Sequence, residues 1–106
     1  MMKNALVILA GGKGKRFGQK IPKQFLKIGN TNFLNYFISK LDLSNFDIIN
    51  ISIDKKYQNT YFDHKAVSEK IKITYSTPGL TRQISLSNTL KNLKKFKIKN
   101  VLIHDA

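Results

Sequence analysis

The stretch ALVILAGGKGKRFG, residues 5–18, decides the fold. Its first part, residues 5–9, is an unbroken apolar run without alternation, which is the pattern of a parallel strand covered on both faces. Residues 10–18 then hold four glycines and three cations, a composition that favours an irregular loop. A buried strand that ends in such a loop predicts an α/β domain with a ligand site beyond the strand.

Three further segments have strand character. They are rich in apolar and β-branched residues and lie at residues 47–53, 71–75 and 100–104. Residues 19–30 contain Pro22 and Gly29 and are expected to be mostly irregular. Residues 55–70 are expected to form a polar connection with room for a short helix.

Two amphipathic helices are predicted between these strands. The first can be capped by Thr31 or Asn32, and its apolar side is formed by Phe33, Leu34, Phe37, Ile38 and Leu41. The second can be capped by Thr81, and its apolar side is formed by Ile84, Leu86, Leu90, Leu93 and Phe96. By this spacing Phe33 and Phe37 belong to the core, together with Phe46.

Strands that alternate with helices favour an α/β fold with a mostly parallel sheet and helices on both faces. In such sheets ligands bind beyond the carboxyl ends of the strands. Three unusual segments follow carboxyl ends in this chain, at residues 10–18, 76–82 and 105–106. We therefore expect these three segments to converge on one edge of the sheet.

Length and charge limit the class of protein. A chain of 106 residues holds at most one domain, and 42% hydrophobic residues are typical of a globular body rather than a disordered basic tail. The net charge of +13 has two open explanations, a codon bias toward lysine or an anionic partner. The last predicted strand reaches the end of the sequence. We therefore expect residues 1–106 to be the N-terminal part of a larger domain whose C-terminal half is absent.

The absence of cysteine excludes a disulfide scaffold, a Cys-based zinc site and a thiol nucleophile. The apolar run near the N-terminus is too short for a signal peptide, and no stretch has the roughly 20 apolar residues of a membrane span. A soluble cytoplasmic protein without a membrane partner is the resulting expectation.

The glycine-rich loop departs from two common phosphate-binding patterns. G-x-G-x-x-G fails because its third glycine position falls on Phe17, and G-x-x-x-x-G-K-[ST] fails because neither Lys13 nor Lys15 precedes a hydroxyl residue. Closely spaced glycines still expose backbone N–H groups that a polyphosphate can approach, and adjacent cations neutralise its charge. A polyphosphate loop is therefore predicted, with a basic surface turn as the alternative.

Four motifs in order make the chain resemble the sugar- and polyol-phosphate nucleotidyltransferases. They are LAGGKGKRF at 9–17, PKQFL at 22–26, PGLTRQIS at 78–85 and HDA at 104–106. Together they resemble the 2-C-methyl-D-erythritol 4-phosphate cytidylyltransferase family of the non-mevalonate isoprenoid pathway. The resemblance implies a Rossmann-like sheet and the transfer of CMP from CTP to methylerythritol phosphate with release of pyrophosphate.

The resemblance also implies roles for the residues of the first two motifs. CTP is expected to be held by the loop residues Ala10, Gly11, Gly12, Gly14, Lys15 and Arg16. Arg16 and Lys23 correspond to the catalytic cations, which stabilise charge that builds on the α-phosphate in the transition state. The family often has alanine where this chain has Gly11.

The other two motifs are expected to complete the CTP site. Gly79 and Ser85 correspond to positions that contact cytosine, and Arg82 is the arginine of the same motif. The family usually has an acidic residue in this motif, where this chain has Leu80 and Thr81. In the last motif Asp105, next to Ala106, corresponds to the aspartate that holds Mg²⁺, an ion that needs only one or two carboxylates beside phosphates and water.

The resemblance implies CTP and a polyol phosphate as small-molecule substrates and a homodimer in the full-length form. Ribitol-5-phosphate cytidylyltransferase is an alternative, since it shares the first, second and last motifs. An alternative of another class is a non-catalytic basic module that binds nucleotide or nucleic acid. It is disfavoured because no aromatic-interleaved basic strand or recognition helix is present. An inert remnant, which would not unfold cooperatively, is a third.

Overall fold

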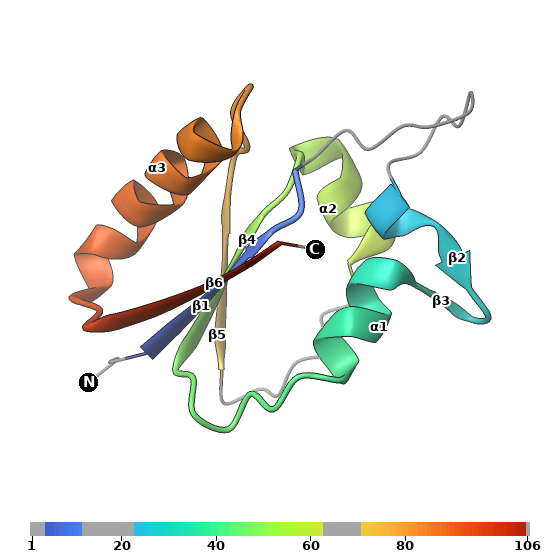
Figure 1. The fold of residues 1–106 in the computed structure, drawn as a ribbon, viewed down its shortest axis with the longest axis horizontal. Helices are drawn as coiled ribbons and strands as arrows, with labels where there is room; N and C mark the ends of the chain where they lie inside the picture. The colour runs from blue at the N-terminus through green and yellow to red at the C-terminus, as the bar shows by residue number, and fades with distance from the viewer. Residues whose placement is uncertain (1–3, 12–22, 63–70, 106) are drawn as a thin grey trace.

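The computed structural model describes residues 4–11, 23–62 and 71–105, and these form a parallel sheet between two layers of helix (Figure 1). The sheet has four strands, β1 (Asn4–Leu9), β4 (Ile48–Ser52), β5 (Lys72–Ser76) and β6 (Asn100–Asp105). Their order is β5-β4-β1-β6, and each neighbouring pair is parallel. The predicted α/β class, the four strands and the parallel pairing are confirmed.

Three helices connect these strands, and the predicted helices on both faces are confirmed. They are α1 (Phe33–Ser39), α2 (Lys55–Tyr61) and α3 (Arg82–Leu93). Asn32 caps α1 by accepting a hydrogen bond from the backbone N–H of Asn35, and Thr81 caps α3 by accepting one from Ile84. In Figure 1 α3 lies on one side of the sheet, and α1 and α2 lie on the other.

The segment expected to be mostly irregular has short regular elements. A turn of 3-10 helix, η1 (Lys23–Phe25), is followed by a small antiparallel hairpin of β2 (Lys27–Ile28) and β3 (Thr31–Asn32). Gly29 turns the hairpin at φ 57°, a left-handed conformation that glycine adopts without strain. Amino-acid composition does not predict these elements, because each is only two or three residues long.

The face of the sheet toward α1 and α2 carries the larger apolar core. Leu6, Ile8, Ile49 and Ile51 from the central strands are buried there against Leu34 and Ile38 of α1, Phe25 and Phe62. Phe37 and Phe46 pack at the border of this cluster, as predicted, whereas Phe33 is 49% exposed and the prediction that it is core is wrong. Phe33 is the first residue of α1, and the side of the helix that faces the core is the one that carries Leu34 and Ile38.

The face toward α3 has a smaller apolar cluster and a polar one. Ala5, Val7, Leu9 and Ile48 pack with Leu93, while Asn50, Ser52 and Thr89 are also fully buried. Asn50 donates to the Thr74 hydroxyl at 2.8 Å and accepts from Ser76 at 2.9 Å, and the hydroxyls of Ser76 and Thr89 lie 2.7 Å apart. Asn50 and Thr89 therefore have hydrogen-bond partners, as burial requires, whereas Ser52 Oγ is buried without one in the described part of the chain.

This arrangement corrects the predicted orientation of the second helix. The buried residues of α3 are Ser85, Thr89 and Leu93, whereas Ile84 and Leu90 are 45% and 44% exposed. The inward residues of β4 and β5 are polar at this level, so the helix turns its hydroxyl residues toward them. Leu93 is buried as predicted and Phe96 packs against the apolar cluster, so the prediction is wrong for Ile84 and Leu90 but not for the whole side. Helix periodicity misses Ser85 and Thr89 because it assumes that an apolar face meets an apolar sheet.

β6 is an edge strand with both faces largely uncovered. Val101 is 38% exposed and Leu102 is 55% exposed, although sequence reasoning treated this strand as buried. Its single partner in the described part of the chain is β1. None of the described helices is long and apolar enough to cross a membrane.

Candidate functional site

The carboxyl ends of the four strands lie at one level. Leu9 is paired in register with Ser52 on one side and with Asp105 on the other, and Ser52 is paired with Ser76. The chain segments that continue from these ends therefore start from a common edge. The predicted convergence of the loops after β1, β5 and β6 is confirmed for their described residues.

Ala10 and Gln24 tie the start of the glycine-rich loop to the η1 segment. The backbone N–H of Ala10 donates to the Ser52 carbonyl at 2.8 Å, and its own carbonyl accepts from Gln24 Nε2 at 2.8 Å. Gln24 is buried and its neighbour Phe25 is inserted into the core, where its ring lies 5.0 Å from that of Tyr57. The backbone of Lys23 is thus anchored directly beside the end of β1.

Gly11 and Pro78 bring the loop after β1 against the loop after β5. A Cβ atom on residue 11 would lie 2.2 Å from Cβ and 2.6 Å from Cγ of Pro78, which is far inside van der Waals contact. Only a residue without a side chain fits there while Pro78 is present. The two predicted site loops are therefore in direct contact at this point.

Gly79 and Ser85 form the turn that leads from β5 into α3. The backbone N–H of Gly79 donates to the Ser85 hydroxyl at 2.9 Å, and a Cβ on Gly79 would collide with Ile84. Ser85 is buried in the first turns of α3. The hydroxyl of Ser85 thus fixes the loop after β5 against the start of α3.

Arg82 and Asp105 join the start of α3 to the end of β6. Arg82 Nε lies 3.1 Å from Oδ1 and 3.3 Å from Oδ2 of Asp105, and Nη2 lies 3.2 Å from Oδ2. Both side chains are more than half exposed, at 56% and 60%. Two predicted site residues are therefore paired with each other at the edge of the sheet.

The donor set at this edge fits a magnesium ion that is shared with phosphates. Asp105 offers an exposed carboxylate, the hard oxygen ligand that Mg²⁺ prefers. Within residues 4–11, 23–62 and 71–105 no group of three or more His, Cys, Asp or Glu could form a complete protein cage. An ion held by this part of the chain would therefore take its other ligands from phosphate and water.

Several predicted site residues cannot be placed. Gly12, Gly14, Lys15, Arg16 and Ala106 lie outside the described residues. For Lys23 the structure describes only the backbone, which lies in η1. The described members of the predicted site are Ala10, Gly11, Gly79, Arg82, Ser85 and Asp105, and all of them lie at the carboxyl edge.

His104 packs rather than pointing into the site, as its position in a strand predicts. Its ring centroid lies 4.4 Å from that of Phe37, at an interplanar angle of 48°. Its Nδ1 lies 2.9 Å from the carbonyl oxygen of Asp105. The neighbour of the predicted metal ligand thus has a packing partner on α1.

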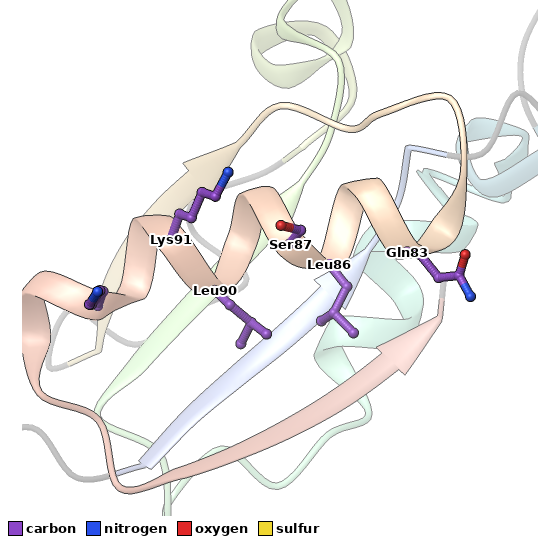
Figure 2. Close-up of a pocket in the computed structure, with 6 residues that line it drawn as sticks. Gln83, Leu86, Ser87, Leu90 and Lys91 are labelled. Carbon is purple, nitrogen blue, oxygen red and sulfur yellow. The ribbon is translucent and has the colours of Figure 1, made fainter.

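A shallow groove on α3 lies apart from these residues (Figure 2). It is lined by Gln83, Leu86, Ser87, Leu90, Lys91 and Lys94. Figure 2 shows Leu86 and Leu90 projecting from the side of α3 along which β6 runs. The groove is the uncovered apolar side of α3, and none of the predicted site residues lines it.

Sequence reasoning missed Gln24 and Pro78. Gln24 belongs to the quoted PKQFL motif, but its contact with Ala10 spans 14 residues and depends on how η1 folds back. Pro78 precedes Gly79, which the sequence does assign to the site, but its contact with Gly11 can be recognised only in the folded chain. In both cases the signal is a spatial neighbour, which a one-dimensional pattern does not contain.

Comparisons with known proteins identify the family of the chain. The family model of 2-C-methyl-D-erythritol 4-phosphate cytidylyltransferase matches residues 4–106. The cytidylyltransferase of Thermotoga neapolitana is 36% identical over 97% of this chain and 46% of its own length. That of Clostridium botulinum strain ATCC 19397 is 37% identical over the whole chain and 47% of its own length.

A longer relative carries two enzyme names. The bifunctional enzyme IspD/IspF of Pelagibacter ubique is 38% identical over 99% of this chain, which corresponds to 28% of its own length. The chain thus spans about half, or less, of the curated relatives that it matches. With a family model matched over almost all of its residues, the chain belongs to the 2-C-methyl-D-erythritol 4-phosphate cytidylyltransferase family.

Proposed function

We propose that this chain is the CTP-binding part of an enzyme that transfers CMP from CTP to 2-C-methyl-D-erythritol 4-phosphate. The observation that carries the proposal is the meeting of three family motifs at the carboxyl edge of the sheet. They meet through the contact of Gly11 with Pro78 and the ion pair of Arg82 with Asp105. Ligands of open parallel sheets bind at this edge.

The cytosine base is assigned to the carboxyl edge of the sheet, where the loop after β1 meets the loop after β5. Ala10 is bonded to Ser52 and Gln24 and so holds Gly11, whose backbone groups lie just beyond the end of β1. Gly79 is held by the Ser85 hydroxyl at the start of α3, which brings that hydroxyl to the same edge. A pyrimidine can be recognised by such groups without any charged side chain. This agrees with the departure at Leu80 and Thr81, where the family usually has an acidic residue.

The triphosphate is assigned to the glycine-rich loop and its cations. Backbone N–H groups around Gly12 and Gly14, with the charges of Lys15 and Arg16, suit three phosphates. Lys23 starts η1, whose backbone is anchored beside Ala10 by Gln24. In the reaction a phosphate oxygen of the acceptor attacks the α-phosphorus, the bond to the bridging oxygen breaks and pyrophosphate leaves.

The protein groups lower the barrier by binding charge that develops on the α-phosphate. Arg16 and Lys23 are proposed to interact more strongly with the transition state than with CTP. Asp105 is proposed to hold Mg²⁺ together with the phosphates. Bound there, the ion would supply positive charge that screens the triphosphate and favours the leaving group.

The acceptor site and a homodimer are proposed for the longer polypeptide, because the relatives extend well beyond the matched length. The resemblance implies that their second half supplies the polyol-phosphate site. Ribitol 5-phosphate is the alternative acceptor, and a direct comparison of the two acceptors separates these activities. Nothing in the described geometry favours the second acceptor over the first.

The first prediction tests this function in the longer polypeptide, for which the acceptor site is proposed. Lys23→Ala should lower the rate of CMP transfer to methylerythritol phosphate by about 10²–10³-fold, the usual effect of removing one transition-state charge donor. Pyrophosphate release measures the rate. Lys27→Ala is the matched control, since Lys27 is an exposed lysine on β2. It should retain the activity.

Full turnover by Lys23→Ala would contradict the proposal. Calorimetric titration with CTP and ATP, each with and without Mg²⁺, adds a test of ligand class. CTP should bind more tightly than ATP and should require Mg²⁺. Binding that ignores the base and weakens steeply with salt would instead indicate a polyanion-binding module.

A further inference from the structure

The ion pair between Arg82 and Asp105 occupies the carboxylate that the proposed function assigns to the metal. Three hydrogen bonds of 3.1–3.3 Å engage both oxygens of Asp105 through the fork of one guanidinium. A cation that binds the same carboxylate must displace at least part of this contact. The protein therefore has an internal competitor for its own proposed metal ligand.

The pair contributes little to the stability of the fold. Both side chains are more than half exposed, and exposed ion pairs add little to the stability of a protein. Arg82 is also the first residue of α3, where the helix dipole disfavours a cation and favours an anion. A contact of this kind opens easily, and its position suits a role in ligand binding better than one in folding.

When the ion pair opens, Arg82 can bind a phosphate at the same edge of the sheet. The start of α3 offers a guanidinium and unsatisfied backbone N–H groups, and Arg82 lies three residues from Gly79 in the contacting loop. A phosphate oxygen is a better partner for a guanidinium than water is. The carboxylate of Asp105 can thus bind a cation while the guanidinium of Arg82 binds a phosphate.

We propose that Arg82 is a positioning residue that holds the carboxylate of Asp105 at the sheet edge and releases it when the nucleotide arrives with its metal ion. This inference rests on the proposed function. In the free protein Arg82 fixes the direction of the carboxylate and weakens its affinity for a divalent cation. In the complex Arg82 is bound to phosphate, so the affinity for the cation rises. By linkage the cation raises the affinity for the nucleotide by the same factor.

The second prediction concerns the cation alone, with Mn²⁺ as the probe. In the absence of nucleotide, Arg82→Gln should bind Mn²⁺ about two- to five-fold more tightly than the unchanged protein, which corresponds to losing an exposed ion pair. Asp105→Asn should bind it more weakly than either. The free Mn²⁺ signal in electron paramagnetic resonance gives the dissociation constants.

Lys91→Gln is the matched control for charge. It removes one exposed positive charge from the same helix without touching Asp105, and it should leave Mn²⁺ affinity nearly unchanged. Circular dichroism shows whether each variant retains its fold. Equal Mn²⁺ binding by Arg82→Gln and the unchanged protein would overturn the inference, as would an equal gain in Lys91→Gln.

The release step has its own readout. At a Mg²⁺ concentration too low to bind without nucleotide, the Nε–H signal of Arg82 in ¹⁵N NMR, identified by its loss in Arg82→Lys, should stay in place and should move when CTP is added. A signal that stays in place when CTP is bound would overturn the release. If no variant binds CTP, the proposed function and the release both fail. The Mn²⁺ order among the variants still decides whether Arg82 competes for Asp105.

Discussion

On the α1 side of the sheet, the strand residues at the centre of the core are apolar: Leu6, Ile8, Ile49 and Ile51. On the α3 side, Asn50 and Thr89 are as deeply buried and are held by hydrogen bonds to Thr74 and Ser76. The α1 face stabilises the fold through the burial of apolar surface, an effect that has no preferred direction. The α3 face depends on geometry, because each buried polar group needs its partner.

The polar face of the sheet is the one next to the predicted site. The polar cluster lies under α3, whose first residues form the site turn, and two of its members stand near the carboxyl ends of β4 and β5. Hydrogen bonds fix the direction of a helix more closely than apolar packing does. The α3 face therefore aims Arg82 and Ser85 at the sheet edge, while the α1 face supplies most of the hydrophobic stabilisation.

The third prediction breaks the apolar face and should have the largest effect. Ile49→Ala removes a fully buried side chain from the centre of that cluster and should lower the free energy of unfolding by about 2–5 kcal/mol. Urea unfolding measures this change. Leu102→Ala, at a 55% exposed position on β6, is the control and should cost less than about 1 kcal/mol. Equal losses would contradict the assigned core.

The fourth prediction addresses the polar face and should have a smaller effect. Thr89→Val keeps the shape of the side chain but removes the hydroxyl 2.7 Å from that of Ser76. The free energy of unfolding should fall by about 1 kcal/mol, since Ser76 keeps its bond to Asn50. The exposed Thr60→Val on α2 is the control, with little change expected.

A double-mutant cycle sharpens this result. Thr89→Val and Ser76→Ala should be non-additive by about 0.5 kcal/mol or more, because both remove the same contact. Additive losses would mean that the two hydroxyls do not interact, and the polar face would then be a set of separate side chains. The nucleotide affinity of Thr89→Val should fall as well, because α3 carries the site turn.

The fifth prediction uses the titratable group at the border of the apolar face. Burial raises the pKa of Tyr75 above its usual value of 10.0, and a hydrogen bond with Gln58 opposes this shift. The folded state therefore holds the proton more tightly than the unfolded chain does. The resulting stability is complete below the ordinary tyrosine pKa and is lost as the pH rises through the folded value.

The expected effect is the smallest of the series. Between about pH 9 and pH 11 the unchanged protein should lose more unfolding free energy than Tyr75→Phe does. Urea unfolding at several pH values measures the difference. Tyr36→Phe, whose ring is 46% exposed, is the control and should follow the unchanged protein. A parallel loss in Tyr75→Phe would mean that Tyr75 is solvated in the folded state.

The sequence predicted the sheet well because its strands are continuous apolar runs, such as residues 5–9, that end in glycine or polar residues. It also predicted that the loops would meet, since parallel strands end at a common edge. For α3 it predicted the burial of Leu93 but not that of Ser85 and Thr89, because hydroxyl residues do not mark the buried side of a helix. Pairings such as Gln24 with Ala10, 14 residues apart, required the folded chain.

The contact between Gly11 and Pro78 restricts how this protein can change. A proline ring is rigid, so it cannot move aside for a methyl group whose Cβ would lie 2.2 Å from its own. Alanine at residue 11 therefore requires a smaller residue at 78, whereas Gly11 is compatible with a smaller residue at 78 without any change of its own. A glycine-rich loop transplanted from a relative that has alanine there would have to bring the loop after β5 with it.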